Sequence, residues 1–282
     1  MQYLENCENR MGISGKLIDM KKKVSFKADL SSTDSRYSRQ VLFNPIGIKG
    51  QEMLAKSKIV IIGCGGLGSV LASNMARAGT GLLRIIDKDR LELSNLQRQL
   101  LFDEMDVKKK LPKVEAARNK LIKINSDIKI EAIFDEVDED NIGDLIDGFD
   151  LVLDGTDNFA TRLVANRVCV DKRIPFIYGA VAASFGMIYN VMPGSGMCLR
   201  CLFREEPDNE NTLNCNTVGI INTAVNIIAS MQSTEALKFL TGNIDAMIKG
   251  LINIDIWDLS VDIIEIRKDS EYTCPVCGGK NA

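Results

Sequence analysis

The apolar positions along the chain follow two periods, one typical of buried strands and one typical of amphipathic helices. Ile59 to Ile62 is a continuous apolar run that ends at a glycine, as expected for a strand buried on both faces. Apolar residues then recur at helical spacing from Leu67 to Ala78, and Leu82 to Asp87 has the pattern of a second strand. The three segments predict a β-α-β unit.

The same alternation of strand and helix continues to about residue 182 and then changes. Further helices are predicted around 114–124 and 163–170, and further strands at 128–134, 150–154 and 175–182. Beyond Phe185 the pattern favours antiparallel strands, at 187–191, 252–256 and 263–266, with a buried helix over 218–240. We therefore expect an α/β fold, a Rossmann-like doubly wound and mainly parallel sheet that continues into antiparallel strands.

The polar character of residues 1–35 predicts an N-terminal tail or arm, and residues 36–282 are expected to form one domain. The sequence has no run of 18 apolar residues, and residues 1–10 lack the apolar stretch of a signal sequence. We expect a soluble, cytoplasmic protein with no membrane partner.

Composition excludes several classes of chemistry. The 35 Lys and Arg against 38 Asp and Glu give a formal net charge of -3, which argues against a nucleic-acid partner. The chain contains no histidine, which removes Ser-His-Asp and Cys-His catalysis and any mixed Cys/His metal site. Its eight cysteines, without a secretory signal, favour metal binding or thiol chemistry over a disulfide framework.

A glycine-rich loop follows the first strand and opens the first helix of the β-α-β unit. The glycines at 63, 65, 66 and 68 allow backbone N–H groups to approach a phosphate, and Asp87 ends the second strand where a carboxylate can accept from a ribose hydroxyl. Together they predict an adenine-nucleotide site. On these residues alone, an NAD-binding oxidoreductase is the favoured interpretation.

Four polar residues beyond Asp87 favour ATP. Asn95 and Arg98 follow the ribose-binding acid directly, and the planar guanidinium of arginine suits phosphate oxygens. Lys113 begins the next helix and adds a positive charge, while Asp157 follows a strand end and offers the oxygen ligand that Mg²⁺ prefers. Any one of these residues on its own is more often a solvated surface group.

At this point the sequence resembles the MoeB/ThiF/HesA family of adenylyltransferases, which is related to the adenylation domains of ubiquitin-activating enzymes. The resemblance spans about residues 36–278 and rests on the segments 36–40, 63–68, 87–89, 94–99, 112–115 and 154–158 and on two Cys-x-x-Cys pairs. It implies ATP-dependent adenylylation, with release of pyrophosphate, of the C-terminal carboxylate of a small ubiquitin-like sulfur-carrier protein ending in Gly-Gly. Such carriers supply sulfur in thiamine or molybdenum cofactor biosynthesis.

The resemblance also implies roles for individual residues. Asp87 is expected to hold the ribose, Arg98 and Lys113 the phosphates, and Asp157 the Mg²⁺. Arg39 is expected to reach the phosphates of a neighbouring subunit, which implies a homodimer. The lack of histidine agrees with this chemistry, because a C-terminal carboxylate is already ionised at pH 7 and needs no general base.

Two pairs of cysteines have the spacing of a structural zinc site. Cys198 and Cys201 form one pair, Cys274 and Cys277 the other, and four thiolates satisfy tetrahedral Zn²⁺ without an open position. A redox Cys-x-x-Cys is the competing interpretation.

Cys215 lies just ahead of a predicted helix, where the helix N-terminus favours a thiolate. It is either the residue that links the carrier covalently after adenylation, as in thiazole-branch relatives, or a spectator. Two other functions stay open: adenylation of a short peptide and a catalytically silent binding subunit.

Overall fold

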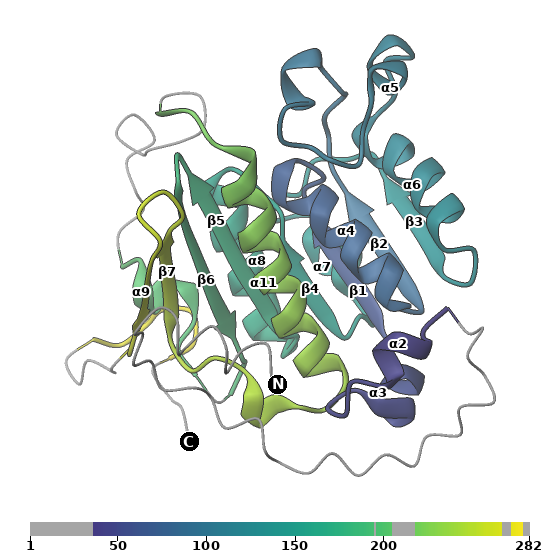
Figure 1. The fold of residues 1–282 in the computed structure, drawn as a ribbon. Coiled ribbons are helices and arrows are strands. Elements are labelled where there is room, and N and C mark those ends of the chain that lie inside the picture. The colour runs from purple at the N-terminus through teal and green to yellow at the C-terminus, as the bar shows by residue number, and fades with distance from the viewer. Residues whose placement is uncertain (1–35, 195, 205–217, 267–271, 279–282) are drawn as a thin grey trace, which may run out of the picture. The chain divides into compact units, whose positions relative to one another are not determined.

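The computed structural model describes residues 36–194, 196–204, 218–266 and 272–278 of the 282-residue chain. In these residues, eight strands form one sheet in the order β3-β2-β1-β4-β5-β6-β7-β8 (Figure 1). Neighbouring strands from β3 to β5 are parallel, and those from β5 to β8 are antiparallel. The doubly wound sheet with an antiparallel continuation, expected from the sequence, is confirmed.

The strands are short and are bounded as follows: β1 Lys58–Ile62, β2 Leu82–Ile86, β3 Lys129–Ile133, β4 Leu151–Asp154, β5 Phe176–Ala182, β6 Phe185–Val191, β7 Leu251–Asp255 and β8 Ser260–Ile264. The α-helices are α2 Ser38–Val41, α3 Gly47–Leu54, α4 Gly66–Ala78, α5 Glu104–Lys108, α6 Lys113–Ile124, α7 Ile142–Ile146, α8 Phe159–Lys172, α9 Leu199–Leu202 and α11 Asn222–Leu240. Two 3₁₀ turns, η2 Leu93–Asn95 and η3 Ile244–Ala246, complete the described elements.

Helices cover both faces of the sheet, which explains the continuous apolar run of β1. Ile59 and Ile61 belong to a core cluster that includes residues of α4, α6 and α11. Val60 and Ile62 point the other way, into a cluster with residues of α7 and α8. Figure 1 shows α4 and α11 in front of the sheet and α8 behind it.

The strand order reverses between β1 and β4. The chain proceeds from β1 to β2 and β3 on one side, and from β4 to β5 on the other. In open α/β sheets, the crevice at the carboxyl ends of the strands at such a reversal is the usual ligand site. The glycine loop after β1 and the turn after β4 therefore meet at the position where a ligand is expected.

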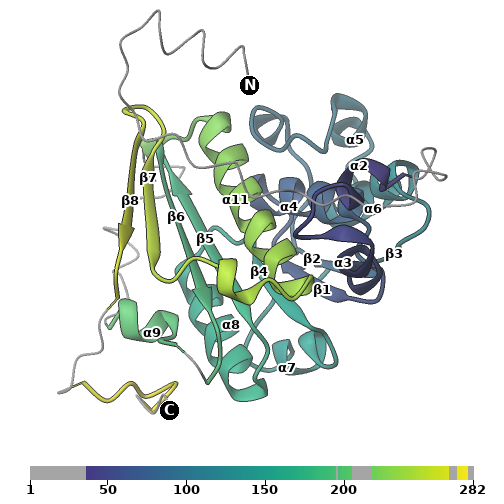
Figure 2. The ribbon, with the colours of Figure 1, turned by 60° about the horizontal axis from the view of Figure 1, so that its bottom comes forward.

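Both boundaries of the last strand differ from the sequence prediction. The last strand is β8 at Ser260–Ile264 instead of 263–266, and it pairs with β7 in a hairpin at the edge of the sheet (Figure 2). All five of its residues are exposed, so burial does not impose the alternation of apolar and polar residues by which a strand is recognised in a sequence.

None of the described helices is long and apolar enough to cross a membrane.

Candidate nucleotide and metal sites

The glycine loop is packed backbone against backbone on the end of β4. Gly63 has φ +89°, and a Cβ added there would stand 2.5 Å from the carbonyl oxygen of Gly155. A Cβ on Gly68 would overlap the carbonyl of Gly63. The loop is tied to its neighbours by the Gly63 N–H bond to Ile86 O at 2.7 Å and the Gly155 N–H bond to Ile62 O at 2.8 Å. Two of the glycines that the sequence singled out are thus required by close packing at the strand reversal.

The loop presents unbonded N–H groups at the start of α4. The cap position, Gly65, has no side-chain hydrogen bond, and no N–H of residues 65–68 has a partner among the described residues. The first N–H groups of a helix, together with its dipole, form an anion site. This arrangement fits a phosphate group.

Asp87 joins the loop to the end of β2. Its Oδ2 accepts the N–H of Cys64 at 2.6 Å, and its Oδ1 accepts the N–H of Asp89 at 2.7 Å. Burial raises the pKa of Asp87 above its ordinary value, although attraction from Lys113 and the two backbone N–H groups oppose the shift. The carboxylate lies where the sequence expects a ribose contact, and its position is fixed by backbone donors.

Lys113 reaches the same group of acids from the first turn of α6. Its backbone N–H donates to Asp89 O at 3.0 Å, and its Nζ lies 2.7 Å from Asp89 Oδ2. Burial alone lowers the pKa of Lys113, but attraction from Asp87 and the bond to Asp89 outweigh it, so the pKa lies above its ordinary value. The lysine is therefore a charged group held beside the loop. The sequence did not single out Asp89 as its partner.

Arg98 lies beside the glycine loop, whereas Asn95 has a local role. Arg98 Cγ lies 3.8 Å from the position of a Cβ added to Gly66, and its Nη1 donates to Ser94 O at 3.1 Å. Asn95 Oδ1 accepts the N–H of Glu92 at 3.1 Å and so caps η2. The structure thus gives the Asn95 carbonyl oxygen a capping function that sequence reading did not anticipate.

Asp157 is exposed on the turn after β4 and forms no hydrogen bond or ion pair with any described residue. The turn is supported below it by Asp154, whose Oδ1 accepts both the N–H and the hydroxyl of Thr156, at 3.0 and 2.7 Å. Arg162 Nε lies 3.1 Å from Asp154 Oδ2. An available carboxylate on a rigid turn suits Mg²⁺ chemistry. The ion pair of Asp154 and Arg162 was missed in the sequence, where the only signal is an arginine at helical spacing from Ala165 and Cys169.

Arg39 does not join this group within its own chain. It is exposed on α2, and its neighbour Gln40 donates from Nε2 to the carbonyl of Ala78, the last residue of α4, at 2.9 Å. The glycine loop lies at the opposite end of this 13-residue helix, about 18 Å away at 1.5 Å per residue. Figure 1 shows α2 beside the lower end of α4.

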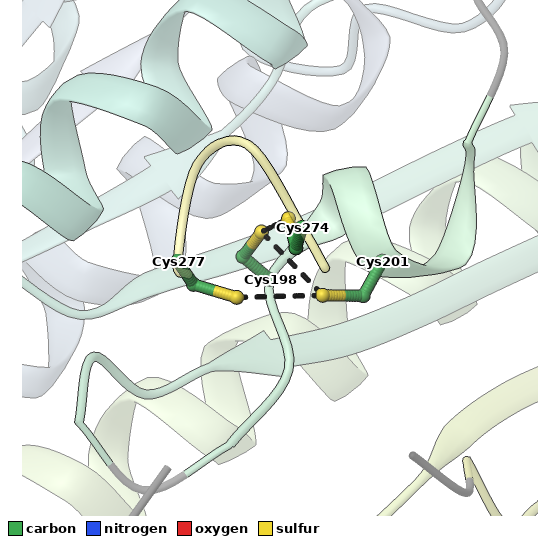
Figure 3. Close-up of side chains that lie close together, drawn as sticks. All are labelled: Cys198, Cys201, Cys274 and Cys277. Atoms are coloured by element: carbon green, nitrogen blue, oxygen red, sulfur yellow. Dashed lines mark hydrogen bonds between the residues drawn. The ribbon is translucent and has the colours of Figure 1, made fainter. Parts of the chain in front are cut away.

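The four predicted zinc ligands come together in a single cluster (Figure 3). Their Sγ atoms all lie within 4.8 Å of one another, with Cys198 3.6 Å from Cys274, Cys201 3.4 Å from Cys277 and Cys198 4.0 Å from Cys201. At a Zn–S distance of ~2.3 Å, a tetrahedral site needs sulfurs about 3.8 Å apart. The cluster fits Zn²⁺.

Hydrogen bonds hold the loop that carries Cys198 and Cys201 in place. Leu199 N–H donates to Asn166 Oδ1 at 2.8 Å, and Tyr189 donates its hydroxyl to Met197 O at 2.9 Å. Such outer contacts are what orient metal ligands. The predicted residue Cys215 and the predicted arm at 1–35 lie outside the described residues.

Comparison with known proteins places the chain in a family. The ThiF family model matches residues 37–276. The chain belongs to the ThiF family. The sulfur carrier protein ThiS adenylyltransferase of Bacillus subtilis is 43% identical over 246 residues, covering 87% of this chain and 72% of that protein. The SAMP-activating enzyme E1 of Haloferax volcanii is 35% identical over 243 residues, covering 86% and 88%.

A solved structure agrees with these relatives. E. coli MccB with AMPCPP and MccA superposes with a TM-score of 0.76 at 25% identity, over 87% of this chain and 75% of that one. The family resemblance inferred from the sequence is confirmed, and the chain is an adenylyltransferase. Membership of this family removes the oxidoreductase alternative.

Proposed function

We propose that this ThiF-family enzyme adenylylates the C-terminal carboxylate of a small ubiquitin-like sulfur-carrier protein ending in Gly-Gly, with MgATP as the second substrate. The observation that carries the proposal is that Asp87, Lys113 and Arg98 border the glycine loop, and that this loop packs at the strand reversal on Gly155, two residues before Asp157. Curated relatives from a bacterium and an archaeon, named for two different carriers, support this kind of partner. Thiamine or molybdenum cofactor biosynthesis is the pathway proposed for the transferred sulfur.

In this reaction, these residues only position the substrates and neutralise charge. The carrier's carboxylate attacks the α-phosphorus of ATP, the new C–O–P linkage forms, and pyrophosphate leaves with the electrons of the broken P–O bond. Arg98, Lys113 and the loop N–H groups would hold the phosphates, while Asp157 would hold Mg²⁺. Because the attacking group is already ionised, a chain without histidine lacks nothing that this step requires.

We place the Arg39 guanidinium in the phosphate site of a second copy of the chain. Its position at the far end of α4 supports this, since an arginine side chain does not span a 13-residue helix. The enzyme would then be a homodimer with two shared sites. The four cysteines would hold one structural Zn²⁺ per chain, which contributes to folding and leaves no position open for catalysis.

Cys215 is proposed to be dispensable for adenylate formation and to act in a later transfer of the activated acyl group. No enzyme thiol enters the attack on phosphorus. A Cys215→Ala protein should still exchange labelled pyrophosphate into ATP. Intact-mass measurement without reductant should show that the carrier conjugate formed by wild type is absent from the variant. Loss of exchange in a folded variant would contradict this separation of steps.

The direct test of the function is exchange of labelled pyrophosphate into ATP in the presence of a recombinant carrier of the ThiS type. Exchange should require the carrier's intact Gly-Gly terminus, so the same carrier lacking its last glycine is the control. Short peptides ending in a free carboxylate test the second candidate function. Exchange with such a peptide but with no ubiquitin-like carrier would overturn the proposal in favour of a peptide substrate.

A further inference from the structure

Asn166 of α8 contacts the loop that carries the first pair of cysteines. The residue is 0% exposed, and its Oδ1 accepts the N–H of Leu199 at 2.8 Å. Leu199 is the first residue of α9, and its N-cap, Cys198, supplies no side-chain hydrogen bond, so the carboxamide of α8 satisfies an N–H that the short helix leaves without an acceptor. Because only the oxygen of a carboxamide accepts, this bond also fixes which end of the side chain is the donor.

The donor end of the same carboxamide is unmatched. Nδ2 is buried and has no hydrogen-bond partner of ordinary geometry among the described residues. Buried polar atoms are nearly always paired, so a carboxamide that is held at one end and unpaired at the other requires a physical reason. Since Nδ2 has almost no accessible surface, its partner must be a group that already packs against it.

The group beside this donor is the thiol of Cys198. Burial raises the pKa of that thiol to about 11, and the Asn166 side chain, as a hydrogen-bond donor, acts against the rise. The contact falls short of an ordinary hydrogen bond, as expected of a thiol, whose sulfur is a weak acceptor. A thiolate is an ionised acceptor and forms stronger hydrogen bonds. The donor is therefore matched when Cys198 is a thiolate, which is the form that ligates zinc.

We propose that Asn166 is a positioning residue of the metal site, with Nδ2 donating to the sulfur of Cys198 when that sulfur ligates Zn²⁺. Oδ1 holds the backbone at Leu199 while Nδ2 holds the sulfur of the preceding residue, so one side chain of α8 orients the ligand. The donor also stabilises the negative charge of a thiolate in a buried cluster. The inference rests on the zinc site of the proposed function and goes beyond it by naming a residue outside the four ligands.

The direct test detects the hydrogen bond itself. Wild-type protein labelled with ¹⁵N is loaded with ¹¹³Cd²⁺, an NMR-active ion that binds thiolate sites as zinc does. A proton that donates to a cadmium-bound sulfur shows scalar coupling to the metal. We expect this coupling at one side-chain amide proton of Asn166 and at neither amide proton of Asn125, a second buried asparagine. Because the measurement uses wild type, it does not depend on the folding of a variant.

A second test compares Asn166→Leu with Asn125→Leu. Leucine has nearly the shape of asparagine and removes both the donor and the acceptor. Asn125 is the matched control, because it is also 0% exposed and its Nδ2 donates to Ala76 O at 2.7 Å and to the Tyr37 hydroxyl at 2.8 Å, outside the cysteine cluster. Zinc affinity is measured by competition with a chromophoric chelator, and the melting temperature is measured with zinc present.

Asn166→Leu should bind zinc about 10–100-fold more weakly than wild type, the range for loss of an outer partner of a metal ligand. Asn125→Leu should lower the melting temperature, because it leaves a buried hydroxyl and a buried carbonyl with one donor fewer, and should keep the zinc affinity of wild type.

Each readout can overturn the inference. Cadmium-loaded wild type without coupling at the Asn166 amide protons would show that Nδ2 does not donate to a ligand. Unchanged zinc affinity of Asn166→Leu, or an equal loss in Asn125→Leu, would leave Asn166 with a packing role. Wild-type protein that binds neither metal would refute the zinc site together with this inference. Carrier-dependent pyrophosphate exchange tests adenylylation separately, so failure of the proposed reaction is distinguishable.

Discussion

Arg162 and Asp154 form a buried ion pair beneath the turn that carries Asp157. The Nε–Oδ2 distance is 3.1 Å, and the two side chains are 10% and 0% exposed. Arg162 Nη2 also donates to the carbonyl of Thr156 at 2.6 Å and to that of Gly179 at 3.3 Å. Asp154 and Asp157 thus stand three residues apart on one turn, one fully buried and paired, the other exposed and unpaired.

Substitution of these two acids by alanine should have opposite consequences. Asp154→Ala leaves the Arg162 charge buried without its partner, and we expect a loss of about 3–5 kcal/mol in the free energy of unfolding, measured in urea. Asp157→Ala should change stability by less than ~0.5 kcal/mol and lower pyrophosphate exchange on the order of 10²–10³-fold.

The two substitutions distinguish the structural role of Asp154 from the proposed magnesium-binding role of Asp157. An Asp154→Ala protein as stable as wild type would show that the ion pair does not order the turn. A folded Asp157→Ala protein with wild-type exchange would remove Asp157 from the role of magnesium ligand.

Much of this site was predictable from sequence because strand ends are predictable. Buried strands are marked by apolar runs, and the residues that follow β1, β2 and β4 must meet at one edge of a parallel sheet. That reasoning gave Gly63, Asp87 and Asp157 their positions without any knowledge of contacts. The edge strand β8 was misplaced by three residues at its start because exposure on both faces removes the periodic signal.

The contacts between side chains were not predictable in the same way. Asp89 as the partner of Lys113, and Arg162 as the partner of Asp154, depend on how α6 and α8 pack on the sheet. Sequence reading therefore finds the groups that face a ligand more readily than the groups that hold them.

The ion pair of Lys113 predicts a pH dependence at alkaline pH. Burial lowers the pKa of Lys113, and attraction from Asp87 and Asp89 outweighs this, so the folded pKa lies above the unfolded value of 10.5. The charged lysine therefore contributes stability that is fully present below pH 10.5 and is lost as pH rises through the folded pKa.

Urea unfolding of wild type and Lys113→Met on both sides of pH 10.5 tests this. The stability difference between the two proteins should shrink above that pH. Lys123→Met, exposed near the end of the same helix, is the control and should leave no such pH-dependent difference. A Lys113→Met difference that stays constant across the range would mean that the pair adds nothing to stability.

The cysteine cluster predicts one zinc per chain and a dependence of folding on that metal. Cys274→Ser removes one of four ligands, so the variant should lose zinc on dialysis and unfold at a lower urea concentration, because structural zinc sites contribute free energy of folding directly. Cys169→Ser is the matched control, since Cys169 is buried on α8 outside the cluster and its loss should leave the zinc content at wild-type level. Elemental analysis of fresh wild-type protein without zinc would contradict the assignment.

Finally, the distance between Arg39 and its own glycine loop predicts complementation between two inactive variants. Arg39→Ala and Asp157→Ala should each lower exchange, and neither residue should affect the fold, because both are exposed. In a mixed dimer, one site would combine the intact Arg39 of one subunit with the intact Asp157 of the other, so activity should return to about one quarter of wild type at equal, random mixing. The exchange assay is run on mixtures whose heterodimer content is verified by native mass spectrometry. If verified heterodimers stay inactive, Arg39 does not act in trans, and the position of α2 at the far end of α4 has only a packing function.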